Sequence, residues 1–173
     1  MPRKSYESLR ARIALVAVFW LSACAALPVH EGYVPCRVFG HLRECIGVPM
    51  ASKEADAAAK RFASSDEERA HVYLVRPYMQ EPKKKSDVFL NGKRVAVLGP
   101  ATYAMVDIPP GRNVFRVHTE GDAQLVLETE PGRTYYLQYQ LDRLFNTVTP
   151  HLKVLREDDG KDKVLRGRRV IFE

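Results

Sequence analysis

DVFLNGKRVAVLGPATYAMVDIPPGRNVFRV, residues 87–117, decides the fold, because it contains two predicted β-hairpins in succession. Asn91-Gly92 lies between two runs of alternating apolar residues, which is the strongest short-range signal for a hairpin. Both residues tolerate the positive φ angles that a two-residue type I′ turn requires. Pairing outward from this turn places Leu90 opposite Lys93 and Val88 opposite Val95.

Two turns that contain proline and glycine predict the next hairpins. Pro110-Gly111 is typical of a type II turn, since proline presets φ at its second position and glycine supplies the positive φ at its third. The same signal recurs at Pro131-Gly132, where residues 124–129 and 134–141 alternate between apolar and polar. Each turn is therefore predicted to join two antiparallel strands of one sheet.

The remaining strands complete a small all-β domain. Residues 71–78 are almost continuously apolar, which predicts a central strand ended by Pro77. Residues 151–155 are predicted to be the last strand. Short strands with regular turn signals indicate a small antiparallel β-sandwich of about seven strands over residues 70–156. Residues 157–173 are a charged C-terminal tail, which fits either a helix or an added strand.

The N-terminus carries a targeting signal. Residues 1–12 are basic and polar, and the apolar run that follows, 13–21, is shorter than the roughly 20 residues of a membrane-spanning helix. Leu21-Ser22-Ala23-Cys24 resembles the bacterial lipobox, which implies a signal peptide over residues 1–23 and acylation of Cys24. The alternative is an ordinary secretory signal with an incidental cysteine. By the sorting rule of such lipoproteins, Ala25 implies an outer membrane location facing the periplasm.

Residues 24–50 are predicted to be a tether or loop, because they contain three prolines and no sustained periodicity. Cys36 and Cys45 are disulfide candidates, since nearby cysteines in an oxidising compartment usually pair. Free thiols are one alternative. Another is a metal site that adds His30 and His41, although this spacing matches no established zinc pattern.

Residues 51–69 are predicted to contain an alanine-rich helix followed by a charged connector. Ser52 is a suitable N-cap, and Glu54 and Asp56 lie favourably in the first turn. A narrow apolar face is expected to dock on the sheet. This face consists of Ala55, Ala58, Ala59 and Phe62.

The charge of the chain is modest. Its 173 residues include 27 basic and 21 acidic side chains, a net charge of +6, and removal of residues 1–23 leaves +3. A charge this small argues against a nucleic-acid partner. The run Lys83-Lys84-Lys85 either protects an edge strand as a solvated loop or contacts anionic lipid headgroups, together with Arg166, Arg168 and Arg169.

The candidate interaction surface combines Lys83, Lys84 and Lys85 with one face of the strand predicted at 134–141. That face presents Tyr136, Gln138 and Gln140, which alternatively are amphipathic sheet residues with solvated hydroxyl and amide groups. We expect no enzyme, because no catalytic motif occurs and the five histidines are dispersed. Asp107 is a candidate base, but acids beside turns usually cap backbone N–H groups. No cofactor or metal is predicted.

Several stretches together resemble the bacterial lipoprotein domain of unknown function 2846, and are similar to the wider PEGA-type β-sandwich. They are VYLVRP (72–77), DVFLNGKRVAVL (87–98), TYAMVDIPPGRNVFRV (102–117) and LVLETEPGRTYYLQY (125–139). VPMASKEADAAAKRFA (48–63) also resembles the lead-in of such lipoproteins. Their lipidated cysteine often lies near that lead-in, where this chain has Cys45, but the charged residues before Cys45 form no lipobox. The resemblance implies a sandwich, an envelope location and no catalytic residues.

We therefore expect a lipid-anchored envelope lipoprotein whose β-sandwich is a non-catalytic interaction module. Acylated Cys24 would hold it to the membrane, and its partner would be an envelope protein or polymer. A second hypothesis is a protein that binds an anionic membrane surface or lipopolysaccharide. The third is a small hydrolase, which would require a deep pocket with converging acids and a histidine.

Overall fold

A computed structural model describes residues 33–38, 41–63, 66–77 and 81–173. The predicted signal peptide, the lipidation site Cys24 and His30 lie outside these residues. None of the described helices is long and apolar enough to cross a membrane.

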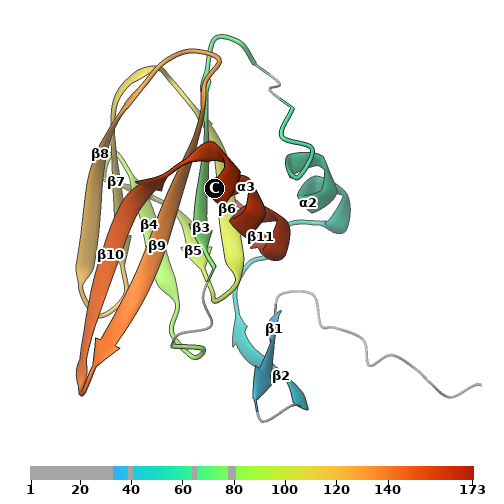
Figure 1. Cartoon of the computed structure of the whole chain (residues 1–173), viewed down its shortest axis with the longest axis vertical. Helices are drawn as coiled ribbons and strands as arrows, with labels where there is room; N and C mark the ends of the chain where they lie inside the picture. Colours follow the sequence, from blue (N-terminus) through green and yellow to red (C-terminus); the bar gives the residue numbers. More distant parts are fainter. Residues whose placement is uncertain (1–32, 39–40, 64–65, 78–80) are drawn as a thin grey trace, which may run out of the picture. The chain divides into compact units, whose positions relative to one another are not determined.

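The described residues form strands and two short helices (Figure 1). The helices are α2 (Lys53–Ala59) and α3 (Glu157–Arg166). The strands are β1 (Tyr33–Val38), β2 (His41–Gly47), β3 (Ala70–Arg76), β4 (Ser86–Leu90), β5 (Lys93–Leu98), β6 (Thr102–Ile108), β7 (Gly111–His118), β8 (Asp122–Thr129), β9 (Thr134–Leu144), β10 (Thr147–Leu155) and β11 (Arg168–Arg169).

Two sheets form the predicted sandwich. One has five strands in the order β10-β9-β3-β6-β11, and the other has four in the order β5-β4-β7-β8. The expected all-β fold is thus confirmed, with nine strands rather than about seven. The five-stranded sheet is mixed rather than antiparallel, because β9 runs parallel to β3 and β11 runs parallel to β6.

The hairpin at Asn91-Gly92 forms as expected. Both residues have positive φ, 50° and 84°, and Leu90 pairs with Lys93. The register then shifts between Val88 and Phe89, so that Val88 pairs with Ala96 rather than Val95. A β-bulge of this kind strengthens the local twist, and it was invisible in the apolar alternation.

The two predicted proline-glycine hairpins are wrong. Residues 109–110 join β6 in the five-stranded sheet to β7 in the four-stranded sheet, and residues 130–133 join β8 to β9 across the same divide. Apolar alternation specifies which face of a strand is buried but not which sheet it enters. Both segments are therefore corners of the sandwich. The hairpins not predicted are β7–β8 and β9–β10.

β3 lies at the centre of the five-stranded sheet, and all seven of its residues are buried. Val72 and Leu74 point into the core between the sheets, with Phe115 and Leu137. Tyr73 and Val75 belong to a second cluster that also includes Ala59 of α2 and Val164 of α3. The continuous apolar run predicted for this strand therefore reflects burial on both faces.

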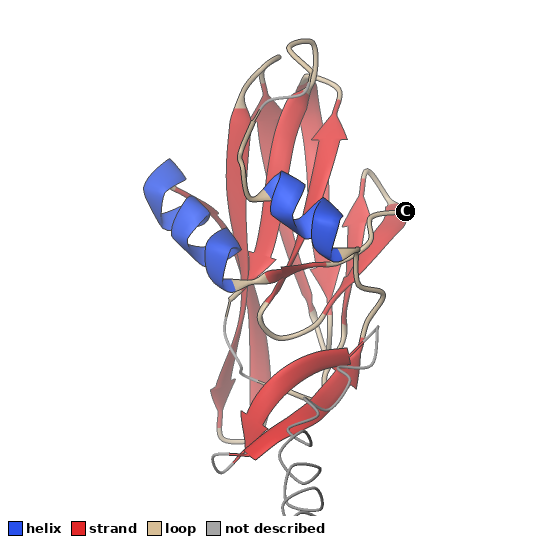
Figure 2. Cartoon of the chain, turned by 90° about the vertical axis from the view of Figure 1, so that its right-hand side faces the viewer, coloured by secondary structure: helices blue, strands red, loops and turns tan. Residues whose placement is uncertain are grey.

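The helices cover the outer face of the five-stranded sheet with an aromatic layer beneath them (Figure 2). Tyr73 stacks on Tyr136 at 5.3 Å between ring centroids and lies 6.1 Å from Tyr103. The Tyr73 hydroxyl donates to the Ala59 carbonyl at 2.8 Å. The predicted N-cap is confirmed, because Ser52 Oγ accepts from the Ala55 N–H at 3.1 Å.

The C-terminal residues resolve the alternatives left open for the tail, since they form a helix and then a strand. After α3, β11 pairs in parallel with β6. The Val170 N–H donates to the Tyr103 carbonyl at 2.8 Å, and the Glu173 N–H donates to the Val95 carbonyl at 2.7 Å. This segment therefore forms the edge of the five-stranded sheet beside β6 and also contacts β5, an edge strand of the other sheet.

The region predicted as a tether contains the antiparallel pair β1–β2. Its backbone register places Cys36 opposite Arg43, and the register shifts between Val34 and Pro35, just before Cys36. The side chains of Cys36 and Cys45 are outside the described part of the chain, so the disulfide stays a prediction.

Candidate functional site

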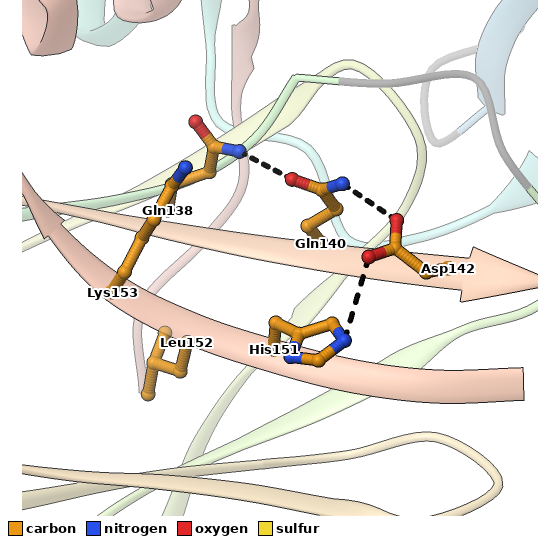
Figure 3. Close-up of a pocket in the computed structure, with 6 residues that line it drawn as sticks. All are labelled: Gln138, Gln140, Asp142, His151, Leu152 and Lys153. Atoms are coloured by element: carbon orange, nitrogen blue, oxygen red, sulfur yellow. Dashed lines mark hydrogen bonds and ion pairs between the residues drawn. The ribbon is translucent and has the colours of Figure 1, made fainter.

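A polar groove on β9 and β10 is the best candidate for a binding site (Figure 3). It has a volume of about 420 Å³ and lies on the outer face of the five-stranded sheet. The lining residues are Gln138, Gln140, Asp142, His151, Leu152 and Lys153. Amide, carboxylate, imidazole and ammonium groups are thus brought together on adjacent strands.

The strand register explains how these residues meet. Gln138, Gln140 and Asp142 alternate along β9, so their side chains share one face. On β10, Lys153 pairs with Gln138, and His151 pairs with Gln140. The groove is therefore built on two hydrogen-bonded strands rather than on loops, which fixes the positions of its polar groups.

A row of hydrogen bonds orders the side chains along the groove. Gln138 Nε2 donates to Gln140 Oε1 at 3.0 Å, and Gln140 Nε2 donates to Asp142 Oδ1 at 2.6 Å. The second carboxylate oxygen of Asp142 lies 3.4 Å from His151 Nε2. Gln138, the innermost member, is only 1% exposed. The row therefore extends from a buried amide to a solvated carboxylate–imidazole contact.

This arrangement suits recognition better than catalysis. Asp142 and His151 keep 50% and 55% of their side chains exposed, so water screens the pair that would have to act as acid and base. The six lining residues include no serine, threonine or cysteine. The groove instead presents donors and acceptors in a fixed order, as a site for a polar chain requires.

The predicted interaction surface is brought together only in part. Gln138 and Gln140 line the groove, whereas Tyr136 is 2% exposed beneath α3. An ideal Cβ at Gly160 of α3 would lie 2.2 Å from Tyr136 Cγ, which shows how closely the helix covers this ring. Burial raises the Tyr136 pKa. Tyr136 is therefore a packing residue, and the prediction of an exposed tyrosine face was wrong.

The lysine run lies on a loop that a buried arginine holds. Arg76, 2% exposed, donates to the carbonyl oxygens of Lys84 at 2.7 Å and Glu81 at 3.1 Å. Burial lowers the Arg76 pKa to about 10. Lys84 forms ion pairs with Glu81 and Glu120, whereas Lys83 and Lys85 are exposed.

The arginines at the C-terminus do not form a free basic patch. Arg166 is paired with Asp162 at 2.8 Å on the surface of α3. Arg169 Nη1 donates to the Ala55 carbonyl at 3.2 Å and so holds α2 against the sheet. Arg168 belongs to β11. Arg169 therefore has a structural role, and Arg166 is paired on the surface.

A second histidine–aspartate pair joins β3 to β6. His71 Nδ1 lies 2.5 Å from Asp107 Oδ1, and its Nε2 lies 3.1 Å from the Asp66 carbonyl oxygen. Both ring nitrogens contact protein acceptors, and His71 is 2% exposed. Asp107 therefore orders a structural imidazole rather than capping the adjacent turn. Among the described residues no group of three or more His, Cys, Asp or Glu is placed to hold a metal ion.

Sequence comparison assigns most of this sandwich to a family. Residues 66–149 match the family model described as "Protein of unknown function (DUF2846)". This segment is therefore similar to the DUF2846 family. It begins just before β3 and includes β9, but its match ends within β10, so α3 and β11 lie beyond it.

A distant relative also matches outside the segment that resembles DUF2846. The chain is 24% identical over 158 residues to an uncharacterized protein of Haemophilus influenzae, covering 85% of this chain and 94% of the relative. The similarity therefore extends beyond that segment into the residues that flank it. Of the groove, Gln138, Gln140 and Asp142 lie within the matched domain segment.

Sequence reasoning found two of the six residues that line the groove. Gln138 and Gln140 were singled out by their alternation with buried residues. Asp142 was missed because the predicted strand ended at residue 141, one residue too early. His151 and Lys153 were missed because they join the site only through the β9–β10 register. The signal available was the short turn at Phe145-Asn146, which a composition-based search for Gly or Pro does not recognise.

Proposed function

We propose that this protein is a lipid-anchored lipoprotein of the bacterial envelope and that its sandwich is a non-catalytic binding module. Its partner is an envelope protein or polymer, which it contacts through the groove on β9 and β10. The observation that carries the proposal is the ordered row Gln138–Gln140–Asp142–His151, fixed on two paired strands. The buried Gln138 orders the row, and Gln140, Asp142 and His151 offer their polar groups to an extended polar ligand.

The anchor is supported by sequence. A basic segment, a short apolar run and Leu21-Ser22-Ala23-Cys24 follow one another in the order of a lipoprotein signal. Several acyl chains give stable attachment, at about 0.8 kcal/mol per buried CH₂ group, without a spanning helix. The outer membrane, with the domain in the periplasm, is the proposed location.

Mass spectrometry of the protein purified from membranes tests the anchor. We expect the mature chain to begin at Cys24 and to carry acyl chains. A Cys24→Ser variant should carry no acyl chains and should retain residues 1–23, because neither acylation nor lipoprotein processing can occur without the thiol. An unmodified Met1, or a processed terminus without lipid, would contradict this part of the proposal.

Crosslinking in cells tests the groove. A photoreactive residue in place of exposed Lys153 should form adducts, whereas one in place of exposed Arg112 on the other sheet should not. An adduct whose mass falls on digestion with lysozyme contains peptidoglycan, whereas a protein partner is identified by mass spectrometry of peptides that do not come from this chain. Equal labelling at both positions, or none at Lys153, would refute binding at the groove.

A further inference from the structure

The tip of the β9–β10 hairpin exposes two large apolar side chains. Leu144 is 71% exposed and Phe145 is 88% exposed, the highest values among the large apolar residues of the described chain. Phe145 has a positive φ of 52°, so it occupies the turn itself. Figure 1 shows this hairpin, in orange, extending beyond the neighbouring strands of the sandwich. Two such side chains at a turn lack any packing role within the domain.

The tip lies beside a loop that presents positive charge. Arg143, next to Leu144, forms an ion pair with Glu81, which begins the loop carrying the lysine run. Glu81 and Glu120 neutralise Arg143 and Lys84. Lys83 and Lys85 remain exposed, and neither takes part in an ion pair found among the described residues.

The loop is held in place rather than free to fold away. Arg76 is buried and donates to two of its carbonyl oxygens, and also to Ser86 Oγ at 3.1 Å. Together with the Arg143–Glu81 pair, these contacts fix the lysines at the same end of the sheet as the apolar tip. Apolar side chains flanked by cations match the interface of an anionic bilayer, where rings enter the acyl boundary and ammonium groups meet phosphate.

We propose that this hairpin tip inserts into the surface of an anionic membrane. Leu144 and Phe145 enter the boundary between headgroups and acyl chains, and Lys83 and Lys85 contact lipid phosphates. The acyl anchor would keep the domain close to that surface, so the inference builds on the proposed function. The inference adds an orientation of the domain on the membrane. When the tip is inserted, the groove on β9 and β10 lies near the membrane surface and stays accessible to a partner from the side.

Fluorescence quenching tests the inference. The sequence has one tryptophan, Trp20, which lies before the predicted cleavage site, so a new tryptophan reports its own position. The processed protein, which lacks Trp20 and carries Phe145→Trp, is reconstituted with vesicles of phosphatidylethanolamine and phosphatidylglycerol that have brominated acyl chains. We expect at least twofold stronger quenching than for Leu165→Trp, a matched control at an exposed leucine of α3. Leu144→Trp gives a second reporter on the same turn.

Charge reversal tests the lysines. In the Cys24→Ser chain, which lacks the anchor, Lys83→Glu with Lys85→Glu should weaken vesicle binding about tenfold or more, since each basic residue near an anionic surface contributes about 1 kcal/mol. Lys93→Glu with Arg112→Glu is the matched control, because it reverses two exposed charges at the opposite end of β4 and β7, and it should leave binding unchanged. Equal, weak quenching at positions 144, 145 and 165 in an acylated protein would overturn the inference while leaving the anchor intact. Strong quenching at the tip of a protein without acyl chains would support the inference while refuting the anchor.

Discussion

At the scale of single residues, Gly160 shows how one position determines what a surface offers. A glycine inside an exposed helix usually lowers stability by roughly 1 kcal/mol relative to alanine. Here the glycine lies directly over the ring of Tyr136, with no space for a methyl group. It allows α3 to cover a ring that strand alternation alone predicted to be available to a ligand.

Gly160→Ala should therefore lower the free energy of unfolding, although helix propensity alone would predict that it raises it. The added methyl group would lie 2.2 Å from Tyr136 Cγ, so either the ring or the helix must move. Overpacking of this kind costs about 1–3 kcal/mol. Urea unfolding followed by circular dichroism measures the change. Asp159→Ala, at the exposed preceding position, is the control, and a stabilised Gly160→Ala variant would show that α3 does not pack as described.

At the scale of elements, α2 is held to the sheet largely by one carboxylate. Asp56 Oδ1 accepts from the Tyr103 hydroxyl at 2.8 Å and from the Arg169 N–H at 2.9 Å, and Oδ2 accepts from Lys60 Nζ at 2.8 Å. Burial raises the Asp56 pKa, but these hydrogen bonds outweigh it and leave the pKa below its ordinary value. The prediction that Asp56 serves the first turn of the helix missed these tertiary contacts.

Asp56→Ala should lower the free energy of unfolding at neutral pH by about 2–3 kcal/mol, because it leaves buried donors without an acceptor. A carboxylate with a lowered folded-state pKa stabilises the protein above its unfolded pKa, and this contribution is lost as pH falls below about 4. The difference in the free energy of unfolding between wild type and variant should therefore become smaller in acid. Denaturant titrations at several pH values measure this difference.

The matched control for this experiment is Asp162→Ala, which removes an exposed ion pair with Arg166 on α3. It should change stability by at most about 1 kcal/mol, as exposed pairs usually do. A difference between wild type and Asp56→Ala that stays constant with pH would show that the carboxylate charge is not what holds α2.

Elements were easier to predict than their pairing. The N-cap Ser52, the turn at Asn91-Gly92 and the central strand at 71–76 each depend on local chemistry, and each was confirmed. The proline-glycine corners failed because a turn motif does not specify whether the strands beside it enter one sheet or two. The β9–β10 hairpin was missed because its turn, Phe145-Asn146, lacks glycine and proline.

At the scale of the whole molecule, the parts of the site that sequence predicted are those on one strand. Gln138 and Gln140 share a face of β9, and period-two alternation is sufficient to find them. His151 and Lys153 come from β10, and the sequence holds no information on which residues they oppose until the register is known. The exposed apolar tip could likewise be identified only from the exposed fractions of Leu144 and Phe145.

The parallel pairing of β3 with β9 has a consequence for how the chain acquires its structure. His71 pairs with Thr134, so β3 cannot pair with β9 until the whole chain between them and β9 itself are available. Local hairpins form within about 1–10 μs, but pairing between distant segments is limited by the entropy of closing the loop. A chain that emerges N-terminus first, from a ribosome or a translocation pore, can pair β3 with β6 early, but one edge of β3 stays unpaired until β9 has emerged. Until then its most apolar strand needs protection from aggregation by other factors.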